Sequence, residues 1–143
     1  MANIVELREM SDAKLEEMLE NNREEMFNLR FQKASARLEN YARLKTVRRE
    51  IAQLETVLNM RQLAIETAVA SKDLTSALAG KEWEATARYS YEDSGWQVTF
   101  ADGSGNELAT ALVNLNKKRP HSRRQAKKDK QQTRRIVAAE VTG

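Results

Sequence analysis

The chain has 143 residues, no cysteine and a formal net charge of +3, from 24 basic and 21 acidic side chains. Its length suffices for one domain, or for a small domain with a large appendage, and excludes a large enzyme core. The lack of cysteine excludes disulfides, thiolate metal ligands and a cysteine nucleophile, and fits a reducing compartment. Without a long apolar run or a signal-like start, we expect a soluble cytoplasmic protein that has no membrane segment.

The charges are strongly segregated along the sequence. Residues 1–29 carry 3 basic and 8 acidic side chains, whereas residues 30–61 carry 8 and 3. Residues 62–116 again carry 3 and 8, and residues 117–143 carry 10 and 2. The two basic blocks are therefore the parts expected to meet a nucleic acid.

The first half of the chain predicts two long helices. After a short apolar opening at residues 4–7, which is too brief to stand alone, Ser11 is a candidate N-cap for a helix from Asp12 to Ala34. Residues 35–40 are a short polar break, and Asn40 is the candidate N-cap of a second helix that extends to about residue 71. Two long helices joined by so few residues must run antiparallel.

Two aromatic residues of the first helix lie outside its apolar stripe. Phe27 and Phe31 point more than about 100° away from that stripe, at 100° per residue. The explanation that we favour is packing against Ile4 and Leu7. The alternative is contact with a neighbouring protein or with RNA.

The second helix has two different faces. Its apolar residues recur with the 3-4-3-4 spacing of a buried seam; they are Leu44, Val47, Ile51, Leu54 and Leu58. The opposite side has no carboxylate and consists of Lys45, Arg48, Arg49, Ala52, Thr56 and Asn59. A cationic surface with small residues can approach a polyanion closely, although such a strip is more often an ordinary solvated face.

A change of pattern at Gly80 marks a small β-rich region. Residues 83–91 and 96–100 alternate apolar and polar residues with a period of two, and the EDSG sequence between them is a hairpin turn. A second turn follows at Asp102, and residues 108–115 fit a strand or a helix equally well. We predict a three-stranded meander covered on one face by the end of the second helix. Its aromatic residues are expected to form a small core rather than to stack on unpaired bases.

The last segment, residues 117–143, is basic and almost free of large apolar residues. It cannot bury a core, so we expect it to be disordered when free and to bind a polyanion through salt-sensitive phosphate contacts. The sequence thus predicts a mainly α fold with three parts: a helical hairpin (1–71), a β-rich extension (72–116) and a basic tail (117–143).

The hairpin resembles the universal large-subunit ribosomal protein twenty-nine family. The family shows an LRFQ-like segment, a Leu-x-Asn turn and a V-R-R-x-I-A run, and the sequence has these at residues 29–32, 38–40 and 47–52 in the same order and spacing. The opening VELREMSDAKLEEML is also similar, so the resemblance covers about residues 1–66. Tyr41 departs from the pattern, since a small residue or proline is expected there.

The resemblance implies a structural protein of the large ribosomal subunit. It would bind ribosomal RNA near the mouth of the peptide exit tunnel, beside the protein numbered twenty-three. The RNA-binding residues implied by the matched motifs are Arg30, Gln32, Asn40, Arg48 and Arg49. Other candidates follow from charge alone: Lys33, Arg37, Arg43, Lys45, Lys117, Lys118, Arg119, Arg123, Arg124, Lys127, Lys128, Arg134 and Arg135.

No pattern of an enzyme is present. The sequence lacks the short motifs of zinc proteases, serine hydrolases and nucleotide-binding loops, and the single histidine, His121, has no acid near it in sequence. We therefore expect no catalytic residue, metal, cofactor or small-molecule substrate. The alternative function is a homodimeric coiled-coil adaptor that binds nucleic acid, in which the apolar seam would close against a second copy. The break at residues 35–40 favours a hairpin within one chain, hence no homo-oligomer.

Overall fold

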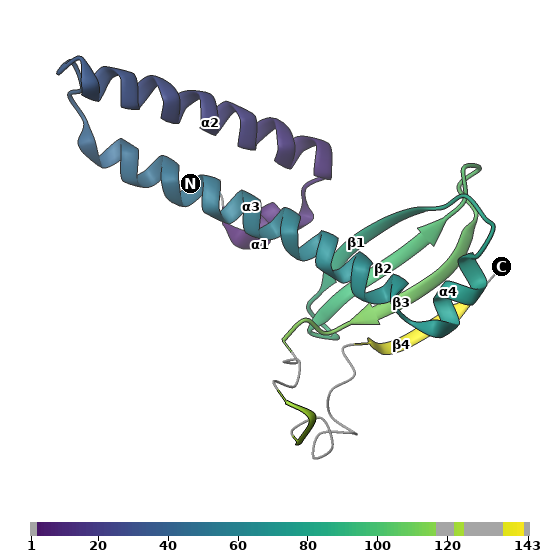
Figure 1. Ribbon diagram of the computed structural model, residues 1–143. Coiled ribbons are helices and arrows are strands. Elements are labelled where there is room, and N and C mark those ends of the chain that lie inside the picture. The colour runs from purple at the N-terminus through teal and green to yellow at the C-terminus, as the bar shows by residue number, and fades with distance from the viewer. Residues whose placement is uncertain (1–2, 117–121, 125–135, 142–143) are drawn as a thin grey trace. The chain divides into compact units, whose positions relative to one another are not determined.

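The computed structural model of the chain describes residues 3–116, 122–124 and 136–141 (Figure 1). It contains two compact units, Met1–Asn59 and Met60–Gly143. The helices are α1 (Ile4–Glu9), α2 (Asp12–Ala34), α3 (Tyr41–Val69) and α4 (Lys72–Leu78). The strands are β1 (Glu84–Ser90), β2 (Gly95–Ala101), β3 (Glu107–Val113) and β4 (Ile136–Val141).

Helix α2 has the predicted bounds. The Ser11 side chain accepts a hydrogen bond from the backbone N–H of Lys14 at 3.4 Å, as expected of an N-cap. The helix ends in a Schellman motif, in which the N–H of Arg37 donates to the Gln32 carbonyl and the N–H of Ala36 to the Lys33 carbonyl. Ala36 therefore adopts a left-handed conformation, with φ of 57°.

The short opening before Ser11 is itself a helix, α1, which the sequence pattern did not predict. Its backbone begins with the Asn3 N–H donating to the Glu6 carboxylate at 3.3 Å. Leu7 is fully buried and lies in one cluster with Leu15 and Leu54. Helix α1 is thus stabilised mainly by the apolar cluster that it completes, because six residues are too few for a stable helix in water.

Helices α2 and α3 form the predicted antiparallel hairpin (Figure 1). The Asn40 side chain accepts from the N–H of Ala42 at 3.1 Å, which makes Asn40 the N-cap of α3. On the predicted seam Val47 and Leu54 are fully buried, and Val57, outside the predicted set, is buried with them. Helix α3 ends two residues earlier than predicted.

The favoured explanation for the two aromatic residues of α2 was wrong. Phe27 and Phe31 remain 70% and 67% exposed and belong to no cluster with α1. Leu7 instead packs against the α2 stripe and the α3 seam. The hairpin therefore displays two large apolar side chains to its surroundings.

The second unit is an antiparallel sheet in the order β1-β2-β3-β4. Residues 107–113 form a strand, which decides the ambiguity at residues 108–115. The Asp102 carboxylate accepts from the N–H groups of Asn106 and Ser104, and these bonds fix the predicted β2–β3 turn and lower the pKa of Asp102.

One face of the sheet holds the core of this unit. Trp96, Val98 and Phe100 are buried there against Ala64 and Ala68 from the end of α3, and helix α4 adds Leu74 and Leu78. The predicted cover by the second helix is confirmed, whereas α4 was not predicted. The aromatic core is only partly as expected, because Trp83 and Tyr91 stay 36% and 52% exposed.

Strand β4 corrects the prediction for the last segment. Residues 136–141 do not belong to a disordered tail, since they pair antiparallel with β3, for example Ala111 with Ala139. The basic residues 117–135 thus lie in the connection between two paired strands. With this sheet, the mainly α description holds for the hairpin, and the whole chain combines α-helices with a β-sheet.

Candidate functional site

The polar side of α3 is exposed along its length. Its six residues, hereafter the cationic face, are all solvent-exposed: Lys45, Arg48, Arg49, Ala52, Thr56 and Asn59. This exposure follows from the helix period, because the buried Val47 and Leu54 occupy the opposite side.

The positive charge of this face is not neutralised within the described residues. None of them forms an ion pair with Lys45, Arg48 or Arg49. Two carboxylates of α3 near this face form ion pairs with other arginines. Glu55 Oε1 lies 2.8 Å from Arg23 Nη2, and Glu50 Oε1 lies 3.9 Å from Arg43 Nη1. The cationic face therefore attracts anions rather than serving internal ion pairs.

Arg43, a predicted RNA contact, has a different role. Its Nε and Nη2 donate to the Glu25 carboxylate of α2 at 2.6 and 2.8 Å. These bonds hold the pKa of Glu25 below its ordinary value. At 100° per residue Arg43 lies only about 20° from Leu54, so the helix period places it on the seam. We therefore leave Arg43 out of the candidate surface.

The turn between α2 and α3 carries further cations. Arg30, Lys33 and Arg37 are exposed and form no ion pair with any described residue. The side-chain oxygen of Asn40 is used as the α3 cap, so this motif residue has a structural role that its match to the family does not reveal.

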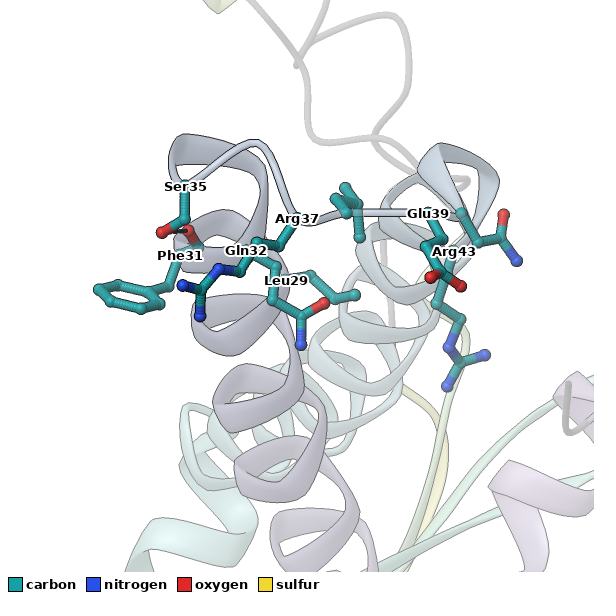
Figure 2. A pocket seen from close by; sticks show the side chains of 9 residues that line it. Leu29, Phe31, Gln32, Ser35, Arg37, Glu39 and Arg43 are labelled. Carbon is teal, nitrogen blue, oxygen red and sulfur yellow. Dashed lines mark hydrogen bonds between the residues drawn. The ribbon is translucent and has the colours of Figure 1, made fainter.

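An open hollow of about 480 Å³ lies at the same turn (Figure 2). Its lining includes the predicted site residues Gln32, Arg37 and Asn40. Phe31 also lines it, with its ring directed away from the α2 axis in Figure 2. Phe31 was not among the predicted site residues, and the hollow was not predicted; the position of Phe31 off the apolar stripe was the signal, and contact with a neighbouring protein or with RNA was the alternative explanation given for it.

Most of the basic segment, residues 117–135, lies outside the described residues, so its position relative to the cationic face is not given. Arg123 and Arg124 are described and exposed. The other predicted contacts of this segment lie outside the described residues; they are Lys117, Lys118, Arg119, Lys127, Lys128, Arg134 and Arg135.

Other kinds of site find no support in the described ranges. Within residues 3–116, 122–124 and 136–141, no group of three or more histidine, aspartate or glutamate side chains is arranged to hold a metal ion. In the same residues, none of the helices combines the length and the apolar character that a membrane span requires.

Comparison with known proteins identifies the hairpin. The model of the ribosomal L29 protein family matches residues 5–61. The large ribosomal subunit protein uL29 of Mycobacterium tuberculosis is 50% identical over 68 residues, which are 48% of this chain and 88% of that protein. The uL29 of Streptomyces griseus is 52% identical over 62 residues, which are 43% and 84% of the two chains. The chain belongs to the ribosomal L29 family.

Membership of the L29 family makes the chain a structural protein of the large ribosomal subunit, bound to the ribosome, and not an enzyme. The matched residues include the LRFQ segment, the turn and the whole cationic face. The L29 match ends before α4 and the sheet, so it carries no statement about the second unit.

Proposed function

We propose that the chain holds ribosomal RNA of the large subunit through phosphate contacts of the cationic face. The observation that carries this proposal is the exposed, unneutralised set Lys45, Arg48 and Arg49 on one side of α3. Arg30, Gln32, Lys33, Arg37 and Asn40 extend the surface around the hairpin turn.

Backbone contacts suit this geometry. Side chains from a helix reach phosphates of A-form RNA without entering its deep, narrow major groove, and such contacts position a protein without reading sequence. Ala52 lies in the middle of the cationic face and is small enough to let an RNA backbone approach the helix. The Thr56 hydroxyl donates to the Ala52 carbonyl at 2.7 Å and is thereby drawn toward its own helix.

The proposed location and protein neighbour are supported by the family likeness alone. On this basis we place the chain near the mouth of the peptide exit tunnel, in contact with ribosomal protein twenty-three. Residues 1–71 would be the part seated on the subunit. Residues 72–116 with β4 would be an added module, and the basic residues 117–135 between its strands β3 and β4 would contact further RNA.

The alternative of a homodimeric coiled coil has less support. Its apolar seam would have to close against a second copy. In this chain the seam residues Leu54 and Val57 are covered by Leu7, Leu15 and Leu19 of the same chain. Ion pairs between α2 and α3 add to this closure.

Charge reversal on the cationic face tests the proposed function. In cells whose only copy carries Arg48→Glu and Arg49→Glu, we expect the protein to leave large subunits at clearly lower salt than the wild type, because two attractive phosphate contacts become repulsive. The measurement is the amount of the chain that sediments with large subunits in gradients of rising salt.

Lys72→Glu with Lys81→Glu is the matched control. Both lysines are exposed, form no ion pair with described residues and lie in the second unit. This variant has the same change in net charge and should behave like the wild type. Equal release of both double variants would mean that total charge matters and that the cationic face has no special role.

A further inference from the structure

Phe31 is the most unusual feature of the hairpin turn. Its ring is 67% exposed, yet it lines the hollow of about 480 Å³ together with polar side chains (Figure 2). Leu29 and Leu38 line it as well, so the lining is both apolar and polar, and the exposed aromatic ring at its edge is a surface for a flat ligand.

The charges around the hollow select the kind of ligand. Arg37, Arg43 and Glu39 line it, and Arg43 is already paired with Glu25. Arg37 forms no ion pair among the described residues, and neither do Arg30 and Lys33, which are adjacent in sequence to lining residues without lining the hollow themselves. These cations favour a ligand in which an anionic group is attached next to a planar aromatic ring. An apolar protein segment would satisfy the ring and would leave the cations without partners, whereas a nucleotide satisfies both.

Paired RNA does not fit this site as well. Bases inside an A-form helix are stacked on each other, and their faces are not accessible to a side chain. Unpaired bases in loops and bulges are free to stack on aromatic rings, with their edges open to hydrogen bonds. The hollow supplies such partners in the Gln32 amide and the Glu39 carboxylate, which accepts from the amino groups of a base.

We propose that the hairpin turn binds one unpaired nucleotide of the ribosomal RNA. Its base stacks on Phe31 and contacts Gln32 by its edge, and its phosphate contacts Arg37. This site rests on the proposed function, because the nucleotide belongs to the RNA that the cationic face holds. Phe27, one turn earlier on α2 and outside the hollow, is not part of the site.

Photochemical cross-linking in intact large subunits tests the site. Short-wavelength ultraviolet light joins stacked bases to aromatic side chains, and nuclease followed by trypsin leaves a peptide that carries a nucleotide. Trypsin cuts after Arg23 and Arg30, so it separates the peptide with Phe27 from the one that begins at Phe31. In wild-type subunits we expect a nucleotide on the peptide that begins at Phe31.

Two substitutions of equal chemistry complete the experiment. Phe31→Leu should lower the yield of this adduct roughly tenfold or more, as expected when one stacking surface is removed. Phe27→Leu, at a residue of similar exposure, should leave the yield unchanged. Because both rings are exposed, neither substitution should impair folding of the full chain.

Three outcomes would overturn the site. They are a wild-type peptide without a nucleotide, an adduct that Phe31→Leu leaves unchanged, and a cross-link from this peptide to another protein. If the chain still sediments with large subunits in these cases, only the nucleotide site fails and the proposed function stands. A chain that is absent from large subunits refutes both.

Discussion

At the scale of single residues, Ala36 holds the least favourable backbone conformation of the hairpin. Its φ of 57° lies in the left-handed region, and it occupies the position after the α2 C-cap where glycine is most common. A residue with a Cβ in this region costs about 1–2 kcal/mol. The hydrogen bonds of the Schellman motif hold Ala36 there, so the strain is local and removable.

Ala36→Gly is therefore expected to stabilise the protein. The relief of strain exceeds the gain in unfolded-chain entropy, which is about 0.4–1 kcal/mol, so the net gain should be about 0.5–1 kcal/mol. Urea unfolding followed by far-ultraviolet circular dichroism measures it. As a control, Ala52→Gly within α3 should destabilise the protein by about 1 kcal/mol. A lower urea midpoint for Ala36→Gly would contradict the strain argument.

The same scale shows what the sequence could reveal about the site. The cationic face follows from helix period and charge, and both are legible in the sequence. Arg43 could have been assigned to the seam by the same period, because it lies close to Leu54 around the helix. Phe31 is different: whether a ring off the stripe is covered depends on which segment folds over it, and no local pattern carries that information.

At the scale of elements, α2 and α3 are held together by packing and by the ion pair of Arg43 with Glu25. The pKa of Glu25 is lowered in the folded chain by the Arg43 hydrogen bonds, and its unfolded value is the ordinary one. Its contribution to stability is therefore fully present above the ordinary pKa and is lost as the pH falls through the folded value. Partial exposure of both side chains keeps the contribution small.

Glu25→Gln should expose this pH dependence. Near pH 7 the variant should unfold at a lower urea concentration than the wild type, and the gap between the two midpoints should narrow as the pH falls below the ordinary pKa of a glutamate. Glu24→Gln removes a neighbouring carboxylate without an ion pair among the described residues and should match the wild type throughout this pH range. A gap that persists at acid pH would show that the pair is not its cause.

The elements that were predicted and those that were missed differ in what stabilises them. Helices α2 and α3 and strands β1 and β2 have caps, turns or periodicity of their own. Helix α1 depends on the cluster around Leu7, and β4 depends on pairing with β3 across the connection 114–135. Such long-range contacts leave little trace in local sequence, and the basic residues before β4 suggested a tail.

At the scale of the whole molecule, each basic region of the sequence belongs to a different part of the fold. The cationic face and the residues around the hairpin turn belong to the first unit. The sheet is poor in basic residues, and the connection between β3 and β4 holds the densest positive charge of the chain. If both basic regions contact RNA, the salt dependence of binding should reflect the total number of phosphate contacts made by the two regions.

A chain that ends at Ser71 should therefore bind large-subunit ribosomal RNA with a weaker salt dependence than the full chain. The first unit has its own apolar cluster and should keep its fold. Each lost phosphate contact lowers the slope of log affinity against log salt by about 0.7–0.9, so several lost contacts are readily measured by titration at a series of salt concentrations. The full chain with glutamine in place of the basic residues of the β3–β4 connection is the control that retains the sheet, and its slope should match that of the short chain.

Equal slopes for the short and the wild-type chain would show that the basic residues of this connection do not contact the RNA. If the short chain did not bind at all, the hairpin alone would be insufficient for binding.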